Sequence, residues 1–147
     1  MAAIDRHAEA QWEGALRTGK GEVTTDSGVL KNTPTTFGMR FQNEPGTNPE
    51  ELIAAAHAVC YCMILSSTLG KRDLTPTRIT TRTTVSLDPQ HPGGTKITRS
   101  RLEVTAEVPG LDENTFREIA QEAERACPVS NALRAIDIEL DARLLNT

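Results

Sequence analysis

Three cysteines, Cys60, Cys62 and Cys127, are the side chains of this chain best suited to nucleophilic or redox chemistry. Cys60 lies inside a long apolar run, and Cys127 stands 67 positions after Cys60. A thiol reacts as its thiolate, and burial favours the neutral thiol, so a buried Cys60 needs a cation from another segment to become reactive. On spacing alone, Cys60 fits a packing role better than a reactive one, because free cysteines are among the most buried residues.

Cys127 stands directly before Pro128, and proline favours the first position of a helix. The pattern therefore predicts Cys127 as the N-cap of a short helical turn, PVSNAL, with backbone N–H groups near its sulfur. Such a place lowers the pKa of a thiol. The alternative is a small residue at a corner between two helices, and the sequence leaves both interpretations open.

Cys62 is two residues from Cys60, which is about 200° around a helix axis. The two thiols would point apart and could not form a disulfide without breaking the helix. We therefore interpret Cys62 as a packing residue.

His57 lies one helical turn before Cys60 and on nearly the same face. It could act as a base or, together with Cys60 and Cys127, bind a metal. Zinc sites use four protein ligands, or three and a water, and often a close Cys-x-x-Cys pair, which is missing here. A histidine packed in the helix interface is the favoured interpretation.

One predicted helix carries His57, Cys60 and Cys62. It covers residues 48–70, NPEELIAAAHAVCYCMILSSTLG, with Asn48 as N-cap, Pro49 in the first turn and Gly70 at the end. A helix that is apolar on every side is buried on every side. One small domain can hardly wrap such a helix, so we expect a second copy to cover it in an obligate homodimer. Its length nearly suffices for a membrane span, but its Ala, His, Ser and Thr content favours a buried core helix.

Composition narrows the class of protein further. The chain has 147 residues, which fits one domain, 1–147. Its net charge is -4 and it has no Lys/Arg block, which argues against nucleic acid as the main partner. The first residues, MAAIDRHAEAQW, lack the apolar core of a signal peptide, and the cysteine count is odd. We expect a cytoplasmic protein.

Hydrophobic periodicity predicts the order βββ-α-ββ-α-β and an α+β fold with largely antiparallel sheet. The expected strands are residues 8–17, 22–30, 35–42, 77–88, 95–108 and 134–144, and a second helix is expected over 113–126, capped by Asp112. In the third strand, TTFGMRFQ, alternation would place Phe37, Met39 and Phe41 on one face and Arg40 on the other. A solvent-facing position is the usual fate of such an arginine. Glu50 and Glu51 suit the first turn of the central helix without any further role.

Taken together, these segments resemble the OsmC branch of the OsmC/Ohr family of peroxidases. The resemblance rests on NPEELIAAAHAVCYCMILS and the distal ACPVSNAL, with WEGALRTGKGEVTTDSGVL, FGMRF and GTNPEEL before them, and covers about residues 8–143. Family members usually carry phenylalanine and a small residue such as serine where this chain has Tyr61 and Cys62. The resemblance implies an intertwined homodimer, with antiparallel sheets around central helices.

The resemblance also implies a role for each site residue. Cys60 matches the peroxidatic cysteine and Cys127 the resolving one. Arg40 matches the arginine that activates the thiolate, and Glu50 the carboxylate that orients this arginine. Local geometry favours Cys127 as the activated thiol, but we follow the family, because Arg40 would supply the cation that Cys60 needs.

The implied activity is reduction of organic hydroperoxides, and more weakly of hydrogen peroxide, with stress defence as the role. The disulfide between Cys60 and Cys127 would be recycled by a dithiol of the lipoyl or thioredoxin type. No cofactor and no metal is expected, because sulfur does the redox work. Two alternatives stay open: a metal-binding protein using His57, Cys60 and Cys127, and a non-catalytic binder of apolar ligands.

Overall fold

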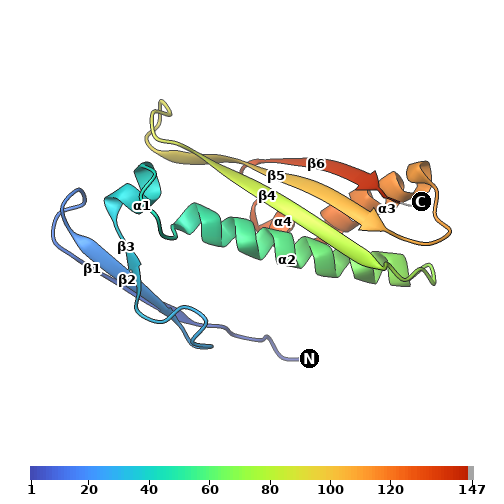
Figure 1. Cartoon of the computed structure of the whole chain (residues 1–147), viewed down its shortest axis with the longest axis horizontal. Helices are drawn as coiled ribbons and strands as arrows, with labels where there is room; N and C mark the ends of the chain where they lie inside the picture. Colours follow the sequence, from blue (N-terminus) through green and yellow to red (C-terminus); the bar gives the residue numbers. More distant parts are fainter. Residues whose placement is uncertain (146–147) are drawn as a thin grey trace. The chain divides into compact units, whose positions relative to one another are not determined.

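The computed structural model describes residues 1–145 of the chain, which divides into two units, Met1–Pro49 and the part from Glu50 onward. The first unit holds one three-stranded antiparallel sheet in the order β1-β2-β3. Its strands are β1 (Ala8–Glu13), β2 (Lys20–Thr25) and β3 (Thr33–Thr35), and the short helix α1 (Phe37–Phe41) follows. All four are labelled in Figure 1.

The strand expected over residues 35–42 is wrong beyond Thr35. Thr36 ends the extended segment and caps α1, because its hydroxyl accepts a hydrogen bond from the Met39 N–H at 3.2 Å. Phe37 and Phe41 are then four residues apart on a helix, and their rings pack with centroids 4.8 Å apart. Arg40 consequently lies in the last turn of a helix rather than on the outer face of a strand.

The second unit is built on the helix α2 (Pro49–Gly70), which the sequence predicts almost to the residue. Strands β4 (Arg78–Asp88) and β5 (Lys96–Glu107) follow as an antiparallel pair. Helices α3 (Glu113–Ala126) and α4 (Pro128–Ala132) then lead to β6 (Asp137–Leu144). Strand β6 pairs with β5 in parallel, so this sheet is mixed rather than wholly antiparallel.

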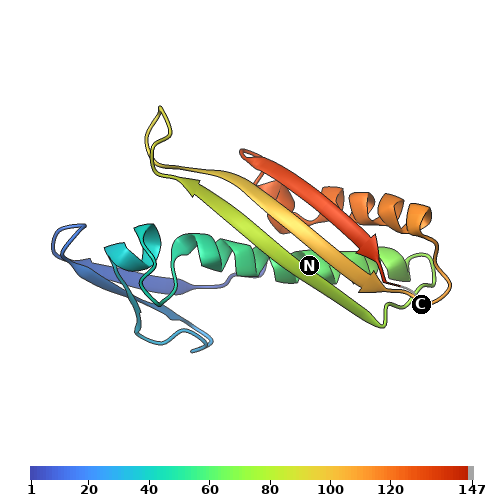
Figure 2. The ribbon, with the colours of Figure 1, turned by 45° about the horizontal axis from the view of Figure 1, so that its top comes forward.

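Helices α2 and α3 cover the same face of the β4-β5-β6 sheet, as the two views in Figures 1 and 2 show. From Ser100 to Ala106 every second residue of β5 is buried, which is the pattern of a strand with one covered face. The core contains residues from all three elements: Tyr61, Leu65 and Leu69 from α2, Leu102, Val104 and Ala106 from β5, and Phe116, Ile119 and Ala123 from α3. Burying each of the larger apolar side chains contributes about 1.5–3 kcal/mol.

Asp112 caps α3 as expected, because its carboxylate accepts a hydrogen bond from the Thr115 N–H at 2.8 Å. The same contacts from Thr115 hold the pKa of Asp112 below its usual value. This cap fixes where α3 begins, and Pro128 fixes where it ends, because proline cannot continue the helix. The corner that carries Cys127 is therefore defined by local sequence.

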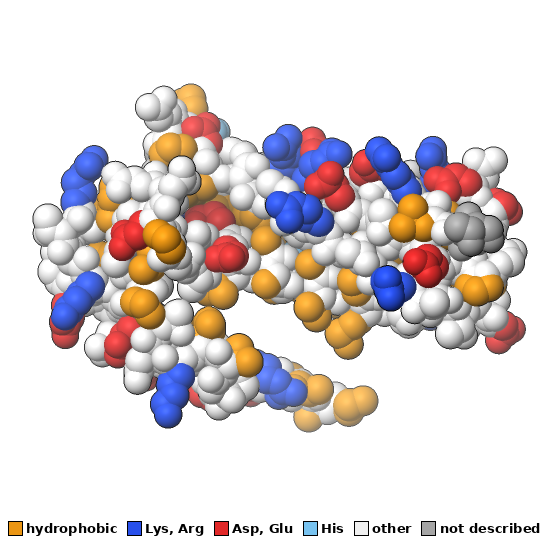
Figure 3. Space-filling model, in the orientation of Figure 1, with side chains coloured by type: hydrophobic (Ala, Val, Ile, Leu, Met, Phe, Trp, Pro, Cys, Tyr) orange, Lys and Arg blue, Asp and Glu red, His pale blue; other side chains and the backbone are white. Residues whose placement is uncertain are grey.

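Within one chain, α2 is buried on one face only, and its covering by a second copy stays a prediction. His57, Tyr61, Leu65 and Leu69 lie on its buried face, spaced four residues apart, whereas Val59 and Met63 on the other side are 61% and 69% exposed. Figure 3 shows hydrophobic side chains on the surface along the second unit. By length and composition α2 could cross a membrane. One face of α2, however, packs against β5 and α3 in the core.

Candidate active site

The sulfurs of Cys60 and Cys127 lie 3.3 Å apart, although 67 positions separate the two residues in the sequence. Cys60 comes from the middle of α2, and Cys127 from the corner between α3 and α4. All three cysteines are free thiols. A disulfide bond is about 2.05 Å long, so a small movement at this corner would bring the two sulfurs to bonding distance.

The two thiols differ in access. Cys127 is 0% exposed, whereas Cys60 is only partly buried. A reactant arriving from solvent therefore meets Cys60 first. Cys127 is enclosed behind it.

The corner holds Cys127 through its backbone. The Cys127 N–H donates to the Glu124 carbonyl at 3.3 Å, and its own carbonyl accepts from the Asn131 N–H at 2.9 Å. As predicted, Cys127 occupies the N-cap position of α4, but its side chain makes no capping hydrogen bond. The backbone N–H of Val129, in the first turn of α4, donates instead to the sulfur of Cys60. The backbone N–H that we expected near the Cys127 sulfur therefore donates to the Cys60 sulfur.

Burial raises the pKa of Cys60 above its usual value. The Val129 N–H opposes this effect, and the neighbouring Cys127 thiol adds to it. Within these contacts Cys60 is a neutral thiol at pH 7. A reactive thiolate at this position needs a further positive charge.

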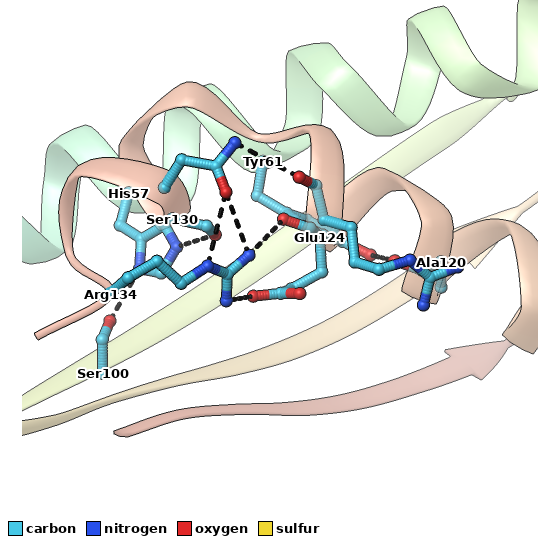
Figure 4. A network of polar contacts seen from close by, with 9 residues as sticks. His57, Tyr61, Ser100, Ala120, Glu124, Ser130 and Arg134 are labelled. Atoms are coloured by element: carbon cyan, nitrogen blue, oxygen red, sulfur yellow. Dashed lines mark hydrogen bonds and ion pairs between the residues drawn. The ribbon is translucent and has the colours of Figure 1, made fainter. Parts of the chain in front are cut away.

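His57 is fully buried, and each of its ring nitrogens pairs with a serine hydroxyl, as Figure 4 shows. Nδ1 lies 2.7 Å from Ser100 Oγ on β5, and Nε2 lies 2.7 Å from Ser130 Oγ on α4. Burial lowers the pKa of His57, the carboxylate of Glu124 partly offsets this, and Arg134 lowers it further. The imidazole is therefore neutral at pH 7, and both of its nitrogens are hydrogen-bonded to serine hydroxyls.

These contacts count against a metal site formed by His57, Cys60 and Cys127. A ring nitrogen could bind a metal only after giving up its serine. Within residues 1–145, no group of three or more His, Cys, Asp and Glu side chains is arranged to hold a metal ion. The packed histidine favoured from the sequence is what the structure contains.

Cys62 points away from the sulfur pair. Its sulfur lies 3.1 Å from Thr81 Oγ1 and 3.9 Å from the Ile79 carbonyl, both on β4. The two-residue offset on one helix therefore separates Cys60 and Cys62, as predicted.

Arg40 and Glu50 lie in different units. Arg40 is in α1, where its guanidinium carbon is 5.4 Å from the centroid of the Phe41 ring. Glu50 is in the first turn of α2 and is 7% exposed. Their roles remain predictions.

Sequence reasoning missed three groups at this corner: the Val129 N–H and the hydroxyls of Ser100 and Ser130. Ser130 lies within the PVS segment, so its nearness to Cys127 was visible, but its partner His57 is 73 residues away. Ser100 gives a weaker signal: it is the one polar residue among the alternate residues of β5 that are buried. A backbone amide carries no signal of its own in the sequence.

The chain is similar in sequence to one protein family over most of its length. The family model described as OsmC-like protein matches residues 41–141. Peroxiredoxin OsmC of Escherichia coli is 49% identical over 141 residues, which cover 96% of this chain and 97% of that protein. An organic hydroperoxide resistance protein of Xanthomonas axonopodis pv. citri is 34% identical over 120 residues, covering 80% of this chain and 82% of its own.

Solved structures agree in fold. The crystal structure of an organic hydroperoxide resistance protein OsmC from Legionella pneumophila has a TM-score of 0.72 at 25% identity, over 97% of this chain and 99% of that one. The structure of OhrB from Bacillus subtilis has a TM-score of 0.69 at 26% identity, over 93% and 98%. The chain belongs to the OsmC-like protein family.

Proposed function

We propose that this protein is a thiol-dependent peroxidase that reduces organic hydroperoxides, and hydrogen peroxide more weakly, as part of stress defence in the cytoplasm. The observation that carries the proposal is the pair of free thiols, with sulfurs 3.3 Å apart and one more accessible than the other. The names of the relatives, peroxiredoxin and organic hydroperoxide resistance protein, support the same role.

The proposed cycle begins with the Cys60 thiolate, which attacks one oxygen of the peroxide. The O–O bond breaks, the alkoxide leaves and takes up a proton to become the alcohol, and Cys60 is oxidised to a sulfenic acid. The Cys127 thiol then displaces the sulfenic oxygen, so that a disulfide forms and water leaves. An external dithiol, of lipoyl or thioredoxin type, reduces this disulfide by exchange and becomes a disulfide itself.

Cys60 is assigned as the attacking thiol because it combines access with stabilisation. It is the less buried of the pair, and the Val129 N–H that points at its sulfur stabilises a negative charge there. Cys127 is enclosed, which suits a thiol that waits for the sulfenic acid.

Arg40 and Glu50 complete the proposed site. The pKa of Cys60 is raised by burial, so the site requires a cation, and the family resemblance assigns this role to Arg40. A carboxylate paired with a guanidinium holds it in a fixed plane, which is the role proposed for Glu50. The guanidinium would also stabilise negative charge on the peroxide oxygens.

We further propose that the protein works as a homodimer and that the two units form one OsmC-like domain. The exposed apolar side of α2, which includes Val59 and Met63, is the surface that a second copy would cover. The family match spans residues 41–141 and so includes parts of both units.

The test compares wild-type protein with Cys60→Ser and Cys127→Ser variants in peroxide consumption driven by a dithiol. Cys60→Ser should lose turnover entirely. Cys127→Ser should consume about one equivalent of peroxide and then gain oxygen on Cys60, because the sulfenic acid has no partner. Measuring a bulky alkyl hydroperoxide and hydrogen peroxide side by side gives the substrate preference, and several dithiols identify the reductant class. Retained turnover in Cys60→Ser would overturn the proposal.

A further inference from the structure

Two sets of side-chain contacts hold the corner that carries Cys127, in addition to its contacts with Cys60. On the exposed side, Arg134 forms an ion pair with Glu124, and its Nε and Nη2 bond Asn131 Oδ1 at 3.3 and 3.2 Å. On the buried side, Ser130 bonds His57 of α2 at 2.7 Å. Figure 4 shows both attachments. Water and salt screen the ion pair, because Arg134 is partly exposed, whereas the bond between Ser130 and His57 is fully buried.

His57 also links the two thiols through short stretches of chain. It lies three residues before Cys60 on α2, and its partner Ser130 lies three residues after Cys127. Val129, whose N–H donates to the Cys60 sulfur, is the direct neighbour of Ser130. Fixing Ser130 therefore fixes the Val129 N–H and the Cys127 sulfur relative to Cys60.

The other ring nitrogen of His57 is paired with a residue outside the thiol-bearing corner. Ser100 on β5 lies 2.7 Å from Nδ1, so both buried nitrogens of the ring have a hydroxyl partner. Helix α2, strand β5 and helix α4 meet at this one ring. Packing needs no such arrangement, since an apolar side chain would fill the space without requiring two hydroxyl partners.

We propose that His57 is a positioning residue for disulfide formation: through Ser130 it holds the first turn of α4 so that Cys127 reaches Cys60 faster than a second peroxide does. This inference rests on the proposed peroxidase cycle. His57 touches neither the substrate nor a sulfur in this role, and acts only through α4.

A matched pair of variants tests the proposal. Ser130→Ala removes the bond toward α4, and Ser100→Ala removes the bond toward β5. Each leaves one buried ring nitrogen without its partner, so both should lower the free energy of unfolding to a similar degree. Only Ser130→Ala releases the thiol-bearing turn.

The readout is the share of Cys60 that becomes sulfinic acid rather than disulfide as the peroxide concentration rises, measured by mass spectrometry. A displacement of about 1 Å can slow a reaction by up to roughly a hundredfold. Ser130→Ala should therefore overoxidise at a peroxide concentration roughly ten- to a hundredfold lower than wild type, and Ser100→Ala within about twofold of it. Equal behaviour of the two variants, or a larger effect in Ser100→Ala, would overturn the proposal.

A second pair covers the case in which Ser130→Ala does not fold. The amide of His57→Gln can replace Nε2 and keep the bond to Ser130, whereas that of His57→Asn can replace Nδ1 and keep the bond to Ser100. His57→Gln should form the disulfide faster than His57→Asn. The reverse order would contradict the positioning role.

A peroxide-free assay separates failure of this proposal from failure of the peroxidase proposal. An aromatic disulfide reacts with Cys60 and releases one aromatic thiolate, and Cys127 then displaces the second. The delay between the two releases reports how readily Cys127 reaches Cys60. It should lengthen in Ser130→Ala and not in Ser100→Ala, even if peroxide is not the substrate.

Discussion

The backbone N–H of Val129 donates a hydrogen bond to the sulfur of Cys60. The turn that follows one cysteine therefore stabilises the other. This contact lowers the pKa of Cys60, but burial raises it by more. The proposed chemistry therefore needs a further positive charge that stabilises the Cys60 thiolate.

Arg40→Ala should raise the pKa of Cys60, because the proposed cation is removed from a thiol that burial already holds neutral. Peroxide consumption at pH 7 should fall by about tenfold or more. The ultraviolet absorbance of the thiolate, followed against pH, measures the pKa directly. Arg40→Lys is the control, since it keeps the charge and loses the planar pair of donors. An unchanged titration in Arg40→Ala would remove Arg40 from the site.

Cys62→Ser should keep full peroxide turnover, because the Cys62 sulfur faces Thr81 and Ile79 on β4 and lies apart from the sulfur pair. The serine hydroxyl can still pair with Thr81 Oγ1, so the free energy of unfolding should change by no more than about 1 kcal/mol. Turnover and mass spectrometry after peroxide treatment check both points. Loss of the disulfide in this variant would mean that the third thiol takes part in the cycle.

Met63→Glu should weaken self-association, because it places a charge on the apolar side of α2 that a second copy is proposed to cover. The dissociation constant should rise at least about tenfold, measured by sedimentation. Gln121→Glu on the exposed side of α3 adds the same charge elsewhere and should leave association unchanged. A wild-type protein that sediments as a monomer would contradict the dimer.

Acid should destabilise the fold through His57. Burial holds its pKa in the folded state below the ordinary 6.5, with Glu124 and Arg134 as the charged groups that also act on it. Below pH 6.5 the unfolded chain binds a proton that folded His57 does not. The free energy of unfolding therefore falls as the pH drops through 6.5, and this contribution stops changing below the folded pKa.

Urea unfolding of wild type and His57→Gln between pH 7.5 and 5 isolates this contribution, because glutamine does not titrate. The variant should show the smaller loss of stability on acidification. Parallel curves would show that His57 is not the group responsible.

The sequence by itself determined the elements whose signals are local. Asn48, Pro49 and an uninterrupted apolar run predict α2, Asp112 and Pro128 delimit α3, and β-branched alternation predicts β4 and β5. These signals arise within a few residues, from capping, ring constraints and side-chain period. The family resemblance came from the same local segments. The weakest local signal, the alternation of Phe37, Met39 and Phe41, misled, because the Thr36 cap and the packing of Phe37 on Phe41 favour a helix there.

Only the tertiary structure decided what depends on distant residues meeting. Three features join distant positions: the parallel pairing of β6 with β5, the contact between Cys60 and Cys127, and the bonds from His57 to Ser100 and Ser130. The residues that they join are 38 to 73 positions apart. No local pattern encodes such pairings, because they follow from how α2, β5 and α4 pack around one core. Packing also assigned the Val129 N–H to Cys60 rather than to Cys127, since the direction of a backbone amide is fixed only when the chain is folded.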